Sequence, residues 1–325
     1  MIKLSSLGDI IHTLPALNAL KKAYPQAEID WVTEEVGMEL LSGHPYINQL
    51  LLYKRYEWPE ALKKGSWVKV LKEVVGFKDQ LQKGYNLVID FQGLLKSAVI
   101  AWLARGNKKI GFANGREGSH FSFHKKYKAN YNEHAVIRYL KLLQFAGIPV
   151  DFNEIVFSLP PAPAIDFKLK APYIVINPTA RWPSKMWFKE KWAALGKDLL
   201  KLGYKVVFTG AKADKVYVDA ICSDCSSAIN LAGKTNLKSL ISLYKQAHLI
   251  ISVDTGTMHL AAAAGNPVIA LFGPTAPWRT GPFGKGHTVI YKSLSCQPCF
   301  RKDCKDKACL KDIEVEEIIE AVKRY

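Results

Sequence analysis

A segment that could hold a phosphate group lies at residues 252–259. Asp254, Thr255 and Gly256 follow an apolar run and come directly before a helical pattern that begins near His259. Backbone N–H groups at the start of a helix carry partial positive charge, so this turn could bind an anion through its N–H groups and hydroxyls. The alternative is that Asp254 and Thr255 only cap the helix, with His259 filling space near the core.

A second polar segment, residues 177–187, carries a hydroxyl and two cations: Thr179, Arg181 and Lys185. It also follows an apolar run and precedes a helical pattern. That order places it at the carboxyl edge of a parallel sheet, where α/β proteins bind their ligands. Lys185 could bring positive charge to a diphosphate and so stabilise a leaving group. The alternative is a surface lysine beside two packing tryptophans.

The first turn of the chain places a carboxylate at the end of the first predicted strand. Its sequence is Ser5, Ser6, Leu7, Gly8 and Asp9. Gly8 lets the backbone turn tightly and approach a ligand, with Ser6 in the same turn. Asp9 could take a proton from an incoming hydroxyl, which is general-base chemistry. An aspartate that only starts a helix would look the same in the sequence.

Positive charge is concentrated in the first half of the chain. The 325 residues carry 45 Lys and Arg against 29 Asp and Glu, a net charge of +16. Residues 54–128 alone hold 16 basic and 6 acidic side chains, a net charge of +10. Such a surface faces acidic partners such as nucleic acid, anionic lipid or phosphorylated and carboxylated substrates. A solvated face rich in lysine is the plainer interpretation.

Four cysteines fall within 14 residues: Cys296, Cys299, Cys304 and Cys309. This density resembles a zinc knuckle, but the spacing is not the usual two pairs of C-x-x-C, so structural zinc and incidental thiols both stay open. The N-terminal residues lack a signal-peptide pattern, and the apolar runs are far shorter than a membrane span. These features predict a cytoplasmic protein whose membrane contact, if any, is peripheral.

Short β-branched runs alternate with helical patterns, which predicts parallel sheets covered on both faces. A Pro-dense stretch at residues 159–166 separates two halves, so we predict domains at 1–160 and 161–312 and a C-terminal helix, 313–325, that packs back on the first domain. The predicted strands are residues 2–4, 28–33, 87–90, 173–177, 205–209, 249–253 and 268–272. The predicted helices are residues 14–23, 69–83, 94–105, 133–145, 189–202, 237–246 and 259–264.

Two common nucleotide-binding fingerprints fail in this sequence. It contains no G-x-G-x-x-G, so a dinucleotide-dependent hydride transfer loses its main support. Gly233, Lys234 and Thr235 look like the end of a P-loop, but Ala228 stands where the first glycine of that motif belongs. The anion-binding turns described above therefore belong to another class of nucleotide chemistry.

Five segments carry a resemblance to a known family: residues 5–17, 30–35, 89–97, 253–262 and 272–275. Together they resemble the ADP-heptose:lipopolysaccharide heptosyltransferases of glycosyltransferase family 9, and those in the first half are most like heptosyltransferase I. The match extends over almost the whole chain. The resemblance implies an α/β GT-B fold, with two Rossmann-like doubly wound domains facing across a cleft. The first domain would bind the acceptor and the second the ADP-sugar.

The resemblance implies an inverting transfer of heptose from ADP-L-glycero-D-manno-heptose to the Kdo of Kdo-lipid A in lipopolysaccharide inner-core synthesis. Asp9 matches the catalytic base that deprotonates the acceptor hydroxyl, and Lys185 would support the departing ADP. The transfer would require no metal. The donor-binding residues that the resemblance implies are Thr179, Arg181, Lys185, Asp254, Thr255, Gly256 and His259.

On the acceptor side, Lys96 and Arg116 occupy the positions of the family's cationic contacts, and Lys54 and Arg55 lie in the corresponding basic segment. Ser6 and Gly8 belong to the same expected acceptor site. Kdo carboxylates and lipid A phosphates at the cytosolic face of the inner membrane would be the targets of the basic stretch. Lys212 departs from the pattern, because it stands where a heptosyltransferase I acid would help to hold the nucleotide ribose.

Two alternatives stay open at this point. A related enzyme, heptosyltransferase II or another GT-B nucleotide-sugar transferase, fits the same motifs. A basic nucleic-acid-binding protein fits the net charge of +16, but the sequence has no recognised nucleic-acid-binding motif and no row of aromatic residues interleaved with the basic stretch.

Overall fold

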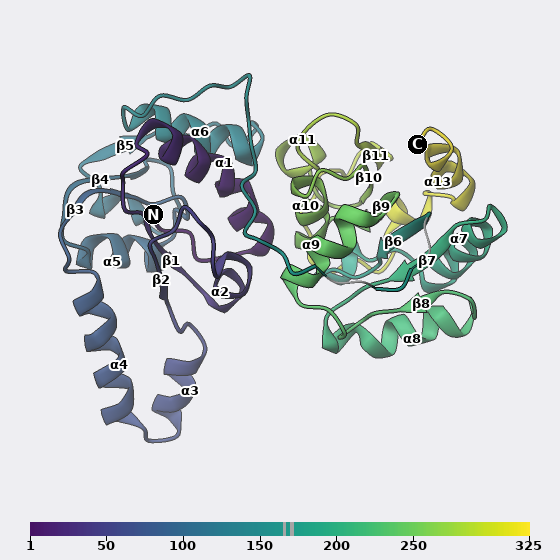
Figure 1. Ribbon diagram of the computed structural model, residues 1–325, viewed down its shortest axis with the longest axis horizontal. Coiled ribbons are helices and arrows are strands. Elements are labelled where there is room, and N and C mark those ends of the chain that lie inside the picture. The colour runs from purple at the N-terminus through teal and green to yellow at the C-terminus, as the bar shows by residue number, and fades with distance from the viewer. Residues whose placement is uncertain (165–166, 170–171) are drawn as a thin grey trace. The chain divides into compact units, whose positions relative to one another are not determined.

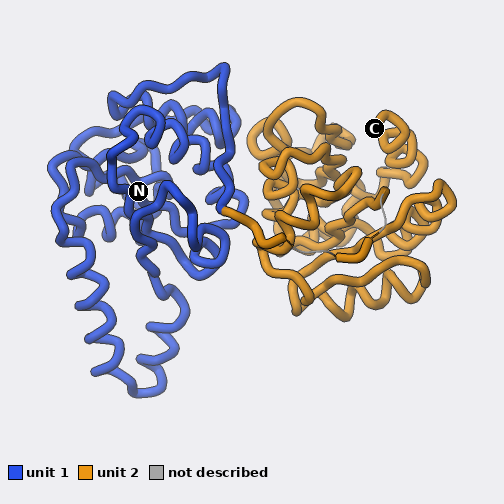
Figure 2. Tube along the Cα trace, in the orientation of Figure 1, with its two compact units in different colours: residues 1–160 blue, residues 161–325 orange. Residues whose placement is uncertain are grey.

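The chain forms two compact units, Met1–Pro160 and Pro161–Tyr325 (Figure 2). The division falls within the Pro-dense stretch at residues 159–166, of which residues 165 and 166 lie outside the described residues. Each unit has its own parallel strands and its own hydrophobic core. The computed structural model describes residues 1–164, 167–169 and 172–325.

Residues 2–4 connect two groups of parallel strands in unit 1. Ile2 bridges to Val32 on one side and to Asp90 on the other, and its N–H donates to the Ile89 carbonyl at 2.9 Å. The structure has isolated bridges at Ile2 in place of the predicted strand at residues 2–4, yet the position of this segment between the two groups of strands places the turn that follows it at a sheet edge. The strands of unit 1 are β1 (Asp30–Thr33), β2 (Gln49–Leu52), β3 (Tyr85–Ile89), β4 (Gly106–Phe112) and β5 (Lys125–Tyr127) (Figure 1).

Helix α1 (Leu7–Ala23) begins seven residues before the predicted helix at 14–23. The Ser6 N–H and hydroxyl both donate to the Asp9 carboxylate, at 3.2 and 2.9 Å, and this closes the first turn. Pro15 therefore lies inside the helix instead of at its start, where it removes one backbone donor. The other helices of unit 1 are α2 (Glu35–Leu41), α3 (Glu57–Lys63), α4 (Trp67–Gln80), α5 (Leu95–Leu103) and α6 (Ala135–Phe145).

Unit 2 contains a six-stranded parallel sheet with the order β11-β10-β9-β6-β7-β8. The chain starts in the middle of this sheet and moves first to one side and then to the other, so β6 and β9 flank the point where the order reverses. Ligands of doubly wound sheets bind at this switch point. The strands are β6 (Tyr173–Asn177), β7 (Lys205–Phe208), β8 (Ile229–Asn230), β9 (Leu249–Val253), β10 (Val268–Phe272) and β11 (Thr288–Tyr291).

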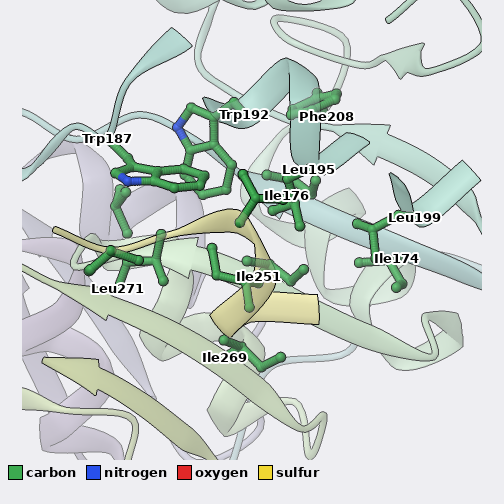
Figure 3. Packing of buried hydrophobic residues seen from close by; sticks show 14 of the residues in the cluster. Ile174, Ile176, Trp187, Trp192, Leu195, Leu199, Phe208, Ile251, Ile269 and Leu271 are labelled. Carbon is green, nitrogen blue, oxygen red and sulfur yellow. The ribbon is translucent and has the colours of Figure 1, made fainter. Parts of the chain in front are cut away.

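The core of unit 2 fills one face of this sheet (Figure 3). Ile176 and Ile251 project into it from the two central strands, and Trp187 and Trp192 meet edge to face with ring centroids 4.8 Å apart. The Trp187 indole N–H donates to the Leu310 carbonyl at 3.0 Å. The helices of this unit are α7 (Lys189–Lys201), α8 (Lys215–Ser223), α9 (Leu237–Gln246), α10 (Gly256–Ala263), α11 (Pro277–Thr280), α12 (Ala308–Lys311) and α13 (Val315–Val322).

The C-terminal helix α13 belongs to unit 2. Ile318 and Val322 are buried in the same core as the central strands, and α13 packs on α7 and β10. Lys191 of α7 fixes the entry to this helix, because its ammonium donates to the Ile313 carbonyl at 2.8 Å and to Glu314 at 2.7 Å. The predicted C-terminal helix is therefore part of unit 2, whose core buries its apolar face.

Among the described residues, none of the helices is both long and apolar enough to cross a bilayer.

Candidate functional site

Asp9 lies in the first turn of α1, directly after the central segment of the unit 1 sheet. Its Oδ2 accepts the two Ser6 hydrogen bonds, and its Oδ1 accepts a hydrogen bond from the Tyr139 hydroxyl at 3.1 Å. The side chain is held on both oxygens but is still 38% exposed. Gly8 is buried beside it, and Ser6 is exposed. The carboxylate is therefore fixed in place and open to an incoming group.

A buried lysine lies behind this carboxylate. Lys3 is only 2% exposed, and its ammonium donates to the Phe91 carbonyl at 3.0 Å and to the Tyr139 hydroxyl at 2.8 Å. Its Nζ is 3.8 Å from Asp9 Oδ1. Tyr139 thus accepts from Lys3 and donates to Asp9, so one hydroxyl connects the cation to the acid. The sequence predictions missed both Lys3, which lies in the segment before α1, and Tyr139 of α6.

These contacts determine the charge of Asp9. Burial alone would raise its pKa, but the positive charge of Lys3 and the hydrogen bonds of Ser6 and Tyr139 outweigh it and lower the pKa from its usual value. Burial in turn lowers the pKa of Lys3, an effect that the nearby Asp9 and Asp90 oppose. An ionised carboxylate that faces solvent is the form a general base needs.

The loop after β3 holds the turn that precedes Asp9 in place. The Gln92 side-chain oxygen accepts hydrogen bonds from the Leu4 and Ser5 N–H groups at 3.0 and 3.1 Å. Asp90 is fully buried and accepts from the Gln92 N–H and from the Ser97 hydroxyl, both at 2.7 Å, while burial raises its pKa to about 6. The segment at 89–97 thus contributes structural support to the first turn.

Two of the predicted acceptor cations converge on one buried carboxylate. Glu34 precedes α2 and is 4% exposed. Lys96, in the first turn of α5, forms an ion pair and hydrogen bond with it, and the Arg55 guanidinium lies 4.0 Å from the same oxygen. Removing Glu34 from water is costly, and these two cations offset that cost. The structure thus brings Lys96 and Arg55 together, as a single acceptor site requires.

Lys54 and Arg116 are placed differently. Lys54 forms ion pairs with Glu57 at 3.3 Å and Glu73 at 3.2 Å, and Glu73 also accepts from the Trp58 indole N–H. These bonds tie α3 to α4, so the contacts of Lys54 are those of a structural residue. The exposed Arg116 is positioned by its backbone N–H, which donates to the Gly93 carbonyl at 2.9 Å.

On unit 2, a lysine and an aspartate meet at the switch point of the sheet. Asn177, the last residue of β6, pairs with Ser252 of β9, so the segments that follow these two strands are neighbours. Lys185 Nζ lies 2.6 Å from Asp254 Oδ2 and 4.6 Å from the centre of the Trp182 ring. The structure therefore brings together the two anion-binding segments found in the sequence.

Asp254 is almost completely buried, whereas Lys185 is partly open to solvent, with side chains 5% and 17% exposed. The Thr275 hydroxyl donates to Asp254 Oδ2 at 2.6 Å. The carboxylate is thus fixed by one hydroxyl and one ammonium. An anionic ligand would find the ammonium of Lys185 already oriented toward the end of β9.

The N-terminus of α10 lies beside this ion pair. Thr255 has an extended backbone and precedes Gly256, the first residue of the helix, and its side chain makes no capping bond to the described residues. The N–H groups of the first turn are therefore available to an anion, and the helix dipole favours negative charge there. His259 lies one turn further along and is 7% exposed.

Thr179 and Arg181 lie on the turn after β6. The Thr179 hydroxyl donates to Asp214 at 3.0 Å, and Asp214 also accepts from the Ala211 N–H at 2.8 Å. Arg181 is exposed. Lys212, which departs from the family pattern, is exposed in the same short turn as Asp214, so a carboxylate stands two residues after the position where the resemblance expects one.

The four clustered cysteines of unit 2 are free thiols, with Cys296 exposed and Cys309 buried. Burial, together with the three neighbouring thiols, raises the pKa of Cys309 to about 11, so it is protonated at neutral pH. Among the described residues, no group of three or more His, Cys, Asp or Glu side chains is arranged to hold a metal ion. The zinc interpretation of this cluster therefore has no metal-binding geometry to support it.

Comparison with known proteins gives consistent matches over the whole length of the chain. The lipopolysaccharide heptosyltransferase 1 of Pseudomonas aeruginosa is 32% identical over 94% of this chain and 86% of its own length. The lipopolysaccharide core heptosyltransferase OpsX of Haemophilus influenzae is 26% identical over 100% of this chain and 95% of its own. Each is a curated relative of similar size.

Solved structures match the fold equally completely. The Escherichia coli heptosyltransferase WaaC with ADP superposes with a TM-score of 0.82 and 26% identity, covering 99% of this chain and 98% of that one. The E. coli ADP-heptose lipopolysaccharide heptosyltransferase II gives a TM-score of 0.76 at 23% identity over 99% and 96% of the two chains. The predicted α/β fold of the GT-B type is confirmed.

The model of glycosyltransferase family 9 (heptosyltransferase) matches residues 74–310. This range includes the loop after β3, Lys96 of α5, Arg116 after β4, and the whole of the Lys185 and Asp254 region. With the curated relatives and the solved structures, it shows that the chain is a glycosyltransferase and belongs to family 9, the heptosyltransferases.

Proposed function

We propose that this protein transfers heptose from ADP-L-glycero-D-manno-heptose to the Kdo of Kdo-lipid A, at the cytosolic face of the inner membrane. One observation carries the proposal: the ionised, partly exposed Asp9 carboxylate, held in place by Ser6 and Tyr139. The relatives support the sugar donor, since an E. coli WaaC structure contains ADP-2-deoxy-2-fluoro heptose. Family membership supports the lipopolysaccharide acceptor.

In the reaction, Asp9 accepts the proton of an acceptor hydroxyl. The freed oxygen attacks the anomeric carbon of heptose, and the bond between that carbon and the ADP oxygen breaks with inversion. The electron pair of that bond leaves with ADP, and the proton stays on Asp9 until solvent removes it. The charge of Lys3 keeps Asp9 ionised before the attack, so that the carboxylate is free to accept the proton.

The departing diphosphate needs positive charge at the switch point of unit 2. The Lys185 ammonium and the first N–H groups of α10 supply it. Thr255 and Gly256 would contact the phosphates through their backbone. Asp254 keeps the Lys185 ammonium at the end of β9. Thr179, Arg181 and His259 complete the proposed donor site.

The acceptor carboxylate would bind to the cations around Glu34. Lys96 and Arg55 share this acid, and a Kdo carboxylate would compete with it for the Arg55 fork, which suits a planar anion. Arg116, together with Ser6 and Gly8 at the start of α1, belongs to the same unit and completes the proposed acceptor site. Lys54 would support the proposed acceptor site only indirectly, because its ion pairs hold α3 and α4 together.

The test is a two-substrate assay with purified full-length protein. Incubation with ADP-heptose and Kdo-lipid A should release ADP and add one heptose to the acceptor, as measured by mass spectrometry. Heptosyl-Kdo-lipid A and several other nucleotide sugars serve as parallel substrates. Turnover with heptosyl-Kdo-lipid A alone would assign the protein to heptosyltransferase II chemistry. Absence of turnover with every ADP-heptose pair would overturn the proposal.

A further inference from the structure

Helix α4 exposes a row of large apolar side chains to solvent. Trp67, Val68 and Leu71 are each about two-thirds exposed, at 66%, 68% and 65%, and Val75 follows them at 47%. Their spacing puts them on one side of the helix, because residues three, four, seven and eight apart lie near one another on a helical surface. The row is a continuous apolar surface instead of scattered single residues.

The fold of unit 1 does not need this surface. Helix α4 already buries another side, through Val70 and Phe77, which are 6% and 8% exposed. Phe77 packs edge to face on Trp58, and with Leu81 it joins the core of the unit. Helix α4 therefore has one apolar face that packs within its own unit and a second apolar face that is exposed to solvent.

Lysines surround the exposed row. Residues 61–72, which contain the turn between α3 and α4, carry four lysines and no acidic residue. All four are exposed. The two glutamates that pair with Lys54, Glu57 and Glu73, lie outside this range. The four lysines are Lys63, Lys64, Lys69 and Lys72.

The helical hairpin formed by α3 and α4 extends away from the strands of unit 1 (Figures 1 and 2). All seven residues of α3 are described, and none of them is buried. The exposed row and the lysines therefore lie on a projecting element that can approach a large flat surface.

We propose that the α3–α4 hairpin docks on a lipid bilayer that contains anionic phospholipids. Docking there deepens the proposed function, on which the inference rests, because it assigns the surface that approaches the lipid-linked acceptor. Trp67, Val68 and Leu71 enter the interface between headgroups and acyl chains, where Trp is favoured. The lysines bind lipid phosphates. A second copy of this chain fits less well, because a symmetric contact would set the four lysines of one copy against those of the other.

The experiment measures flotation of the full-length protein with vesicles that lack any acceptor. The vesicles are phosphatidylcholine alone or phosphatidylcholine with phosphatidylglycerol. The wild-type protein should bind the anionic vesicles and be released by high salt, because salt screens the lysines. The double variant Trp67→Ser with Leu71→Ser should partition at least about tenfold more weakly, since two large apolar side chains are lost. Lys69→Gln with Lys72→Gln should weaken binding to anionic vesicles only.

Matched control variants are available in unit 2. Val216 of α8 is 81% exposed, and Lys245 of α9 is also exposed, so Val216→Ser and Lys245→Gln remove the same kinds of side chain elsewhere. Both controls should bind vesicles like the wild type. Because all the substituted side chains are exposed, each variant should unfold at nearly the wild-type temperature, which circular dichroism checks.

The outcome is independent of catalysis. Turnover with a water-soluble Kdo acceptor should be unchanged in the Trp67 and Leu71 variant, whereas turnover with acceptor in anionic vesicles should fall. Equal vesicle binding by that variant and the wild type would overturn the docking proposal while leaving the proposed function intact. So would lipid-independent self-association that the variant abolishes, because the row would then be a contact between copies of the chain.

Discussion

Both units of the protein pair a lysine with an aspartate at the end of a central strand, but the exposure of the two partners is reversed. In unit 1 the lysine is buried and the acid is open: Lys3 is 2% exposed and Asp9 38%. In unit 2 the acid is buried and the lysine is more open: Asp254 is 5% exposed and Lys185 17%. The partner that faces solvent is the one a ligand can reach.

The reversal assigns different chemistry to the same pair of residue types. A buried cation behind an exposed carboxylate keeps that carboxylate ionised, which suits proton removal. A buried carboxylate that pairs with a more exposed ammonium fixes the direction in which that ammonium points, which suits anion binding. In the proposed reaction, the buried member of each pair would tune or orient its partner, and the more exposed member would contact the substrate. The following substitutions test this difference, from the largest expected effect to the smallest.

Replacing the exposed acid should have the largest effect. Asp9→Asn keeps the shape of the side chain but removes the base, and we expect kcat to fall by about 10³-fold to 10⁴-fold. ADP affinity, measured by calorimetry, should be unchanged because Asp9 lies outside the donor unit. Asp79→Asn, an exposed acid on α4, is the matched control and should retain full activity. A kcat for Asp9→Asn close to that of the control would exclude Asp9 as the base.

Replacing Lys185, the more exposed partner in unit 2, should have the second-largest effect on turnover. Lys185→Met removes the ammonium from the diphosphate, and we expect turnover to fall by about 10²-fold to 10³-fold with weaker ADP binding. Lys189→Met, four residues away and paired with Asp224 at 3.6 Å, is the control for loss of a nearby charge. If both variants bind ADP equally well, the pairing with Asp254 is structural and Lys185 has no role toward the donor.

Replacing Lys3, the buried lysine of unit 1, should change catalysis through its effect on the pKa of Asp9. Lys3→Met removes the charge that lowers the pKa of Asp9, so this pKa should rise and the acid limb of the pH profile should move to higher pH. We expect kcat at neutral pH to fall by about tenfold, because a larger fraction of Asp9 is then protonated. Removing one partner of a buried ion pair also lowers stability, so the unfolding temperature should fall as well. A lower kcat with an unmoved acid limb would show that Lys3 only stabilises the structure.

The smallest effect on kcat should come from removing the Tyr139 hydroxyl, which lies between the charges of Lys3 and Asp9. Tyr139→Phe removes one hydrogen bond to Asp9 and one acceptor for Lys3, while its ring keeps its contacts with Phe91 and Phe112. One such bond corresponds to a fall in kcat of about threefold to tenfold. Stopped-flow or steady-state kinetics measure it. A loss as large as that of Asp9→Asn would mean that the Tyr139 hydroxyl takes part in the proton transfer together with Asp9 and does more than position it.

Much of the fold could be predicted because the central strands are apolar over their whole length. The predicted strands at 173–177, 249–253 and 268–272 have the bounds of β6, β9 and β10. Strand β4 escaped prediction because its sequence, Gly106–Phe112, is polar and rich in lysine and glycine at its start. Strand β8 has only two residues and gave no apolar run, whereas β11 was missed although its four residues do form a short β-branched run.

The candidate site was predicted where a motif stands at the end of a strand. Asp9, Lys185, Asp254 and Thr255 were all found in this way. Asp214 and Tyr139 were not predicted, because their contacts join residues far apart in the chain. Thr179 donates to Asp214, and Asp9 accepts from Tyr139, which lies 130 residues away. Lys3 was missed for another reason, since a lysine in a short strand usually lies at the surface.

The sequence by itself determined the α/β class, the main strands, the division near residue 160 and the residue types available for chemistry. Apolar runs and helix-start signals are local, so they can be read without knowing the fold. Only the tertiary structure decided which member of each lysine and aspartate pair faces solvent. Burial depends on what packs around a side chain, and Lys3 is covered by Phe91 and Tyr139, residues that the fold brings to it from other elements.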